Sequence, residues 1–98
     1  MLLRESELVE CLVVGSLLGE GGIAALTDQR LVFVTEREWV PDVFELAVDA
    51  ALTVSGMQDE RTASLTFSSG AHTVVVEKIS DRPLAMEMAQ RIRARTGG

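Results

Sequence analysis

The sequence predicts a mainly β domain of about seven short antiparallel strands followed by one C-terminal α-helix. Two observations predict this fold class. Most apolar segments are short, rich in β-branched residues or alternating in polarity, and are separated by Gly, Asp and Ser. Only residues 80–98 combine a helix-capping start with helical spacing of apolar residues. With 98 residues, 47% of them apolar, the chain is expected to form a single domain over residues 1–98 without disulfides or metals.

The N-terminal third is expected to contain the first strand, from Leu8 to a break at Gly15. The β-branched content of this segment favours a strand. A helix from Leu2 to Leu18 also fits the apolar spacing, and the conformation of Leu2 to Glu7, helical or extended, stays open.

Glycines punctuate the segment Gly15 to Gly22, which predicts a loop or a loosely paired hairpin tip. Leu17 and Leu18 would then be apolar residues on a loop. We expect them to pack over one end of the core, with a partner contact as the alternative.

Residues Ala25 to Thr35 are expected to form a β-hairpin that sets the pairing of the surrounding strands. Thr27 and Asp28 can direct side-chain oxygens to nearby backbone N–H groups, which stabilises a tight reversal. The returning strand is expected to begin at Gln29 and Arg30 and to continue into a β-branched and aromatic run.

A charged connection from Thr35 to Asp42 is expected to follow, because Pro41 cannot donate a ladder hydrogen bond. Trp39 is the one tryptophan of the chain. It is expected either to cover one end of the barrel or to act in recognition.

Apolar residues occupy alternate positions from Phe44 to Val54, which predicts strand structure with one buried face. An unbroken strand of this length would be unusual, so a bend is expected at Ala47 to Asp49. Ser55 to Thr62 is polar and contains a glycine, which predicts a turn.

Two strands are expected next, Ala63 to Ser68 and His72 to Ile79, joined by a turn with Gly70 at its left-handed position. Residues 74–76 are all valine, so this strand is apolar on both faces. Its outward face is therefore expected to be covered.

The last element is predicted to be an amphipathic helix. Ser80 or Asp81 can cap its first N–H groups, Pro83 is tolerated in the first turn, and Gly97 can end it. One apolar arc is expected to pack on the sheet: Leu84, Ala85, Met88, Ala89 and Ile92. Met86 points away from this arc, so it is expected to be exposed or to take part in association, and Glu87 and Arg91 are spaced for an ion pair.

The net charge of −6 argues against binding to nucleic acid or to anionic membranes in general. Residues 82–98 carry +3, however, while residues 1–81 carry −9. Arg82, Arg91, Arg93 and Arg95 therefore form a basic patch on an acidic body. We expect a solvated helix face, with a partner contact as the alternative.

Groups for catalysis or metal binding are scarce. His72 is the one histidine and Cys11 the one cysteine. One residue of each kind fits no zinc-binding motif. Cys11 is expected to be a small buried apolar residue. Paired acids such as Asp59 and Glu60 are expected to lie in solvated loops. We therefore expect no catalytic, cofactor or metal site.

Nothing in the sequence suggests a secretory signal, a membrane span or an oxidising compartment, so the expected location is cytoplasmic.

The string Leu-Thr-Asp-Gln-Arg-Leu-Val-Phe-Val at Leu26 to Val34 resembles the signature of bacterial pleckstrin-homology-like domains, including the YokE-like group, and of the related GRAM domains. The resemblance implies a partly open barrel of two orthogonal sheets with the helix plugging one end. The chain departs from the pattern at Ala47, where a turn residue is common, and in its acidic balance. The loop Ser16 to Gly22 contains Glu20 and no basic residue, so phosphoinositide binding does not carry over.

The expected function is that of a non-catalytic binding or adaptor module for a protein or peptide. Its expected site is the groove between the C-terminal helix and the neighbouring sheet edge, flanked by Arg91, Arg93 and Arg95. The alternative is a structural module that forms a homo-oligomer through its strand edges, with four residues at subunit contacts: Leu17, Leu18, Trp39 and Met86. Docking to a membrane surface through the arginine helix ranks third.

Overall fold

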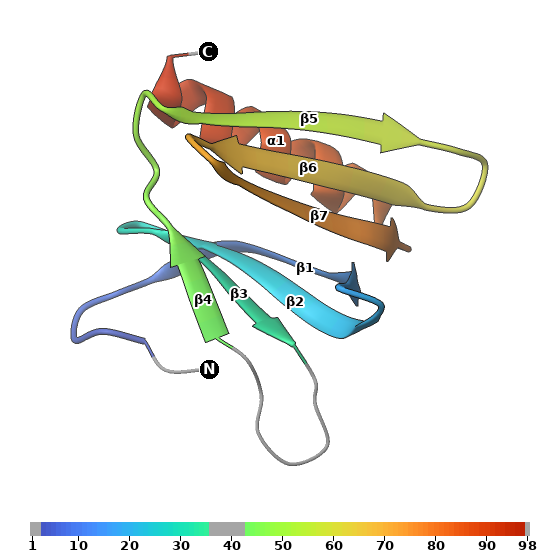
Figure 1. The fold of residues 1–98 in the computed structure, drawn as a ribbon, viewed down its shortest axis with the longest axis horizontal. Helices are drawn as coiled ribbons and strands as arrows, with labels where there is room; N and C mark the ends of the chain where they lie inside the picture. Colours follow the sequence, from blue (N-terminus) through green and yellow to red (C-terminus); the bar gives the residue numbers. More distant parts are fainter. Residues whose placement is uncertain (1–2, 36–42, 98) are drawn as a thin grey trace.

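The computed structural model describes residues 3–35 and 43–97, which form seven strands and one helix (Figure 1). In chain order the elements are β1 (Val9–Leu17), β2 (Glu20–Thr27), β3 (Leu31–Thr35), β4 (Val43–Leu46), β5 (Leu52–Gln58), β6 (Ala63–Ser69), β7 (His72–Ile79) and α1 (Arg82–Thr96). The predicted fold class is confirmed: the strands pair antiparallel throughout and the helix packs on them.

The strands lie in the order β4-β3-β2-β1-β7-β6-β5, so β4 and β5 are the two outer strands. β1 and β7 meet at only two residue pairs, Ser16 with Glu77 and Leu17 with Val76. This short junction joins two layers, one formed by β1 to β4 and the other by β5 to β7 (Figure 1). The result is the partly open barrel that the sequence predicts.

Aromatic side chains link the two layers in the core. The ring of Phe33 on β3 stacks on Phe44 of β4 at a centroid distance of 5.1 Å. Its other neighbour is Phe67 on β6, which it meets edge to face at 5.4 Å. Phe33 and Phe67 are fully buried, and their contact therefore packs the two layers against each other in the core.

Helix α1 has the predicted caps and buried face. The Asp81 carboxylate accepts a hydrogen bond from the Leu84 N–H at 3.1 Å, and Gly97 ends the helix in a left-handed conformation. The buried residues are Ala85, Met88, Ala89 and Ile92, which pack toward β5, β1 and β6. Leu84 is half-buried.

The prediction that Met86 points away from the core is wrong. Its side chain is half-buried and packs against the core, and a Cβ built on Gly56 would lie 3.0 Å from the Met86 Cε. The reason is the length of β5, which runs to Gln58 and so supplies sheet surface beneath this side of the helix.

Of the two structures predicted for Gly15 to Gly22, the hairpin tip is found and the loop is wrong. β1 continues through Gly15 to Leu17, and a two-residue turn of Leu18 and Gly19, both with positive φ, leads into β2. Leu17 is fully buried in a strand, whereas Leu18 is 69% exposed at the turn. Gly15 permits a close approach rather than a break, because a Cβ there would lie 2.4 Å from the Glu77 carbonyl oxygen. The alternative N-terminal helix is excluded for the described residues of that segment.

The predicted division of the segment from Phe44 to Val54 is confirmed, since β4 ends at Leu46 and β5 begins at Leu52. The predicted turn from Ser55 to Thr62 is too long. Only Asp59 to Thr62 turns, because the Asp59 carboxylate accepts the N–H groups of Arg61 and Thr62 at 2.8 and 2.7 Å.

Two boundary predictions have different outcomes. β3 begins at Leu31 rather than at Gln29, because Gln29 and Arg30 belong to the turn. The strands β6 and β7 and the left-handed Gly70 between them are confirmed, with φ of 59° at Gly70. Trp39 and the charged connection around it lie outside the described residues.

Candidate functional site

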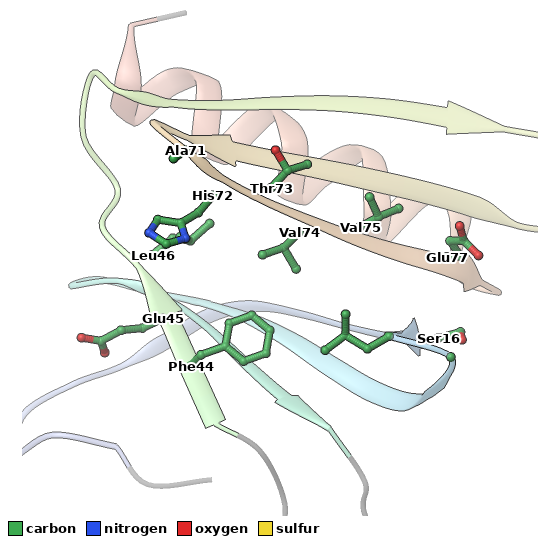
Figure 2. A pocket seen from close by; sticks show the side chains of 12 residues that line it. Ser16, Phe44, Glu45, Leu46, Ala71, His72, Thr73, Val74, Val75 and Glu77 are labelled. Atoms are coloured by element: carbon green, nitrogen blue, oxygen red, sulfur yellow. The ribbon is translucent and has the colours of Figure 1, made fainter.

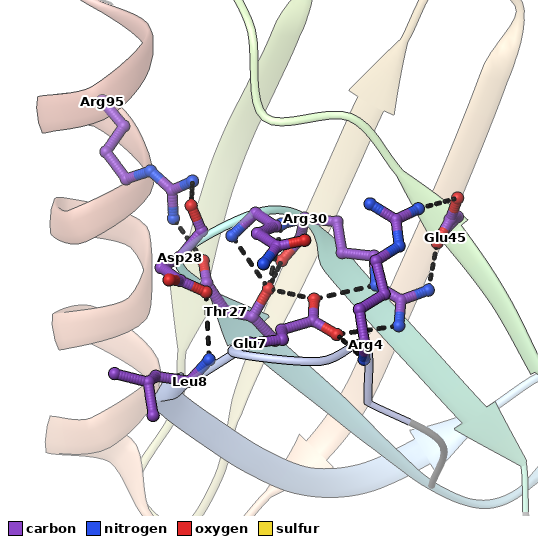
Figure 3. A network of polar contacts seen from close by, with 9 residues as sticks. Arg4, Glu7, Leu8, Thr27, Asp28, Arg30, Glu45 and Arg95 are labelled. Carbon is purple, nitrogen blue, oxygen red and sulfur yellow. Dashed lines mark hydrogen bonds and ion pairs between the residues drawn. The ribbon is translucent and has the colours of Figure 1, made fainter.

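The segment Thr27 to Arg30 carries a polar network around a buried carboxylate (Figure 3). The Arg30 guanidinium donates twice to Glu7, from Nε to Oε2 at 2.8 Å and from Nη2 to Oε1 at 2.9 Å. Thr27 donates its hydroxyl to Glu7 Oε2 at 2.7 Å, and the backbone N–H of Arg4 donates to Oε1 at 2.8 Å. Arg30 also pairs with Glu45 on β4. The network therefore holds the N-terminal segment, the β2–β3 turn and β4 together.

Burial alone would raise the pKa of the Glu7 carboxyl group, because an apolar environment disfavours charge. The hydrogen bonds from Arg30, together with those from Arg4 and Thr27, outweigh that effect and lower the pKa to about 2. Glu7 is therefore ionised across the physiological pH range and bound within the fold. Its role is structural rather than that of an acid or base.

The arginines of α1 are engaged in contacts within the chain. Arg91 pairs with Glu87 at 3.4 Å, as predicted, and lies 4.0 Å from Glu10. Arg95 lies 3.8 Å from Glu10 and donates to the backbone carbonyls of Thr27 and Asp28. These contacts fix the end of the helix to β1 and to the β2–β3 turn.

The groove between α1 and the outer strand β5, where the sequence suggested a partner site, is filled by side chains of this chain. Arg93 donates from Nη2 to the backbone carbonyl of Val54 on β5 at 3.1 Å. Met86 covers Gly56 two residues further along the same strand. A partner strand added at the edge of β5 would have to displace the contact from Arg93, and a ligand over the face of β5 would have to displace Met86.

A cavity of about 730 Å³ lies between β4 and the first half of β7 (Figure 2). Three segments form its walls. The first is the end of β1 with the turn that follows it, the second is β4, and the third is β7 with the turn before it. The lining residues are Ser16, Leu18 and Gly19, residues 44–46, residues 71–75 and Glu77. The volume is within the range of pockets that bind small ligands, roughly 300 to 1,000 Å³. Of the predicted contact residues in the described part of the chain, Leu18 is the one that lines it.

The β7 wall of this cavity is a strand edge rather than a strand face. A face presents every second residue, whereas residues 71–75 line the cavity consecutively. The pairing explains this. β7 pairs with β1 only at Val76 and Glu77, so His72 to Val75 extend beyond the end of β1, and in the described part of the chain no strand lies beside them on that side.

The register indicates which backbone groups point toward the cavity. Ser69 and His72 flank the two-residue turn between β6 and β7, so they form a hydrogen-bonded pair. Bonding to β6 then alternates, and Val74 also bonds to β6. Thr73 and Val75 therefore direct their N–H and C=O groups away from β6, toward the side that β1 does not reach.

The side chains of the cavity are mostly apolar, among them Leu18, Phe44, Leu46 and Val74. Polar groups stand at the two ends: Figure 2 shows Ser16 and Glu77 at one end and His72 beside Leu46 at the other. Such a surface offers apolar burial and directional backbone groups, which are the requirements for holding an extended peptide.

The structure does not bring Cys11 to His72. Cys11 is 4% exposed with its Sγ 3.9 Å from the Leu84 carbonyl oxygen of α1, and burial raises the pKa of its thiol. His72 lies at the cavity instead. Among residues 3–35 and 43–97, no three His, Cys, Asp or Glu side chains gather closely enough to hold a metal ion.

Comparisons of the chain with protein-family models, with curated proteins and with solved structures found no match. Helix α1, with its 15 residues, is shorter than a membrane-crossing helix, and no helix among the described residues is long and apolar enough to cross.

Proposed function

We propose that this domain is a non-catalytic binding module that accepts an extended segment of a protein partner as an additional strand beside β7. The observation that carries the proposal is the free edge from His72 to Val75, where Thr73 and Val75 point backbone groups toward an apolar cavity. An unpaired strand edge is a template for another strand, and adjacent pockets select its side chains.

The dimensions support strand addition. At about 3.3 Å per residue, the four residues of the edge span roughly 13 Å and match a segment of four to six residues. Alternate side chains of an added strand would enter the cavity, between Phe44 and Val74, and the others would face solvent. The edge of β5 is a poorer template, because Arg93 already donates a hydrogen bond to the backbone carbonyl of Val54 there.

The absence of catalysis is part of the same proposal. Its support is that Cys11 is buried beneath α1 and Glu7 is held by Arg30, so neither reaches His72 at the cavity. The fold class and the signature at Leu26 to Val34 support, in the same way, a place among bacterial pleckstrin-homology-like domains.

The test is selection of binders from a displayed library of random short peptides, followed by affinity measurements on two variants. Thr73→Pro removes the outward N–H and adds a ring at the edge, while the bonds from His72 and Val74 to β6 remain. Thr73→Ala, the matched control, removes the side chain but keeps the N–H. We expect selected peptides to bind the wild type and Thr73→Ala alike, and to lose at least ten-fold in affinity with Thr73→Pro.

Two results would contradict the proposal: selected peptides that bind Thr73→Pro as tightly as the wild type, or a library that yields no binder. A second copy of the chain is the competing occupant of the same edge. Light scattering over a range of protein concentrations distinguishes it, because self-association at this edge predicts a dimer that Thr73→Pro dissociates.

A further inference from the structure

We propose that the segment accepted beside β7 is cationic, carrying a Lys or Arg where it reaches the β1–β7 junction. This inference rests on the proposed function and adds the chemical class of the partner. It follows from the charge at the two ends of the cavity and from the point at which β1 stops an added strand.

The end of the cavity at the β1–β7 junction carries an acidic group that no charged side chain of the described residues neutralises. Glu77 lines the cavity, is exposed and forms no ion pair with any residue in 3–35 or 43–97. Ser16, its strand partner, is uncharged. A basic side chain brought here would therefore gain an ion pair without displacing an existing one.

The other carboxylate of the cavity is already neutralised. Glu45 pairs with Arg30 and lies 3.3 Å from the Arg4 guanidinium, and Figure 2 shows its side chain directed away from Phe44 and the cavity. Glu77 is therefore the carboxylate that distinguishes a basic segment from an acidic one.

The register brings one end of the added strand to Glu77. A strand that pairs with Thr73 and Val75 cannot continue past Val75, because Leu17 and Ser16 of β1 already occupy the places opposite Val76 and Glu77. Its last residue therefore lies at the β1–β2 turn, next to Glu77. The chain's net charge of −6 attracts the same class of partner over a longer range.

The experiment uses two end-blocked peptides of about seven residues, which alternate Val and Thr to suit the strand edge. One carries Lys at both ends and the other carries Glu. Affinities are measured at low and high salt for the wild type, Thr73→Pro, Glu77→Gln and Glu60→Gln. Glu60 lies in the exposed β5–β6 turn, so the two glutamine variants have the same net charge.

We expect the wild type and Glu60→Gln to bind the Lys peptide about five-fold more tightly than the Glu peptide at low salt, with the difference shrinking at high salt. Glu77→Gln should lose most of that preference. Equal affinity of the wild type for the two peptides, or a preference in Glu77→Gln as large as that in Glu60→Gln, overturns the inference about charge. Binding that is insensitive to Thr73→Pro, or binding of neither peptide, overturns the proposed function as well.

Discussion

Arg30 and Glu7 form a two-point contact in which both carboxylate oxygens of a buried acid accept hydrogen bonds from one guanidinium, at 2.8 and 2.9 Å. The Glu7 side chain has no exposed surface, and Thr27 donates a third hydrogen bond to it. The contact explains why Thr27 and Arg30 stand three residues apart: the turn presents both side chains to the same carboxylate. A guanidinium can donate two parallel hydrogen bonds to one carboxylate and so fixes its orientation, which the single ammonium group of a lysine could not do.

The first prediction concerns acid stability. The pKa of Glu7 falls from 4.5 to about 2 on folding, so the folded state favours the ionised form. The stabilisation is therefore complete above about pH 4.5 and is lost as the pH falls toward 2. In urea titrations, Glu7→Gln should be less stable than the wild type at pH 7, and the gap should narrow steadily below pH 4.5. A gap that is constant from pH 7 to pH 3 would contradict this account.

The second prediction concerns the packing of α1. Ile92 is fully buried between the helix and the sheet, so Ile92→Ala should lower the free energy of unfolding by about 2 to 5 kcal/mol. Ile92→Asp should unfold the domain, because it buries an unpaired charge. Gln90 is exposed on the same helix, and Gln90→Ala should change stability by less than about 0.5 kcal/mol. Urea denaturation measures all three. A fully folded Ile92→Asp would refute the docking of the helix.

The third prediction concerns the β1–β7 junction, which forms one end of the cavity. A Cβ at Gly15 would lie 2.4 Å from the Glu77 carbonyl oxygen, so Gly15→Ala should cost about 1 to 3 kcal/mol and weaken the pairing of Ser16 with Glu77. Val14 is 55% exposed on the same strand, and Val14→Ala is the matched control. Thermal unfolding would report the difference, and equal stability of the two variants would argue against the close approach.

The fourth prediction concerns the covered edge of β5. Removing the hydrogen bond from Arg93 to the Val54 carbonyl by Arg93→Ala should cost about 1 kcal/mol. It should also make aggregation faster, because it exposes a strand edge. Arg61→Ala, in the β5–β6 turn, removes the same charge and is the matched control. It should lower stability less and speed aggregation less than Arg93→Ala. Light scattering during incubation would separate them, and matching aggregation rates would contradict the edge-covering role.

Local chemistry made much of the fold predictable from the sequence. The turn at Thr27, the caps of α1 and the left-handed Gly70 are set by side chains or dihedral preferences of neighbouring residues. The Asp28 carboxylate, predicted to act locally, instead accepts the N–H of Leu8. The true length of β1 was not predictable in this way. From its neighbours in sequence, Gly15 predicts the end of a strand. In the structure a glycine is needed there because the backbone of Glu77, more than sixty residues away along the chain, approaches closely.

The candidate site was largely hidden for the same reason. The three consecutive valines at residues 74–76 predicted that the outward face of β7 would be covered, and this is wrong, because Val75 is 38% exposed. The free edge exists because β1 ends at a two-residue turn opposite Val76, and no local pattern on β7 reports where another strand ends. The arginines of α1 make contacts within the chain, to α1 itself, β1, β5 and the β2–β3 turn, and their role in a partner contact stays a prediction.

Amide hydrogen exchange along β7, followed by NMR, tests the central claim most directly. The claim predicts alternation in the free protein: the amides of Thr73 and Val75 should exchange on the order of ten-fold faster than those of Val74 and Val76, which bond to β6. Addition of the Lys-flanked peptide should then slow exchange at Thr73 and Val75. Uniform protection of all four amides in the free protein would mean that the edge is already paired, and would contradict the account.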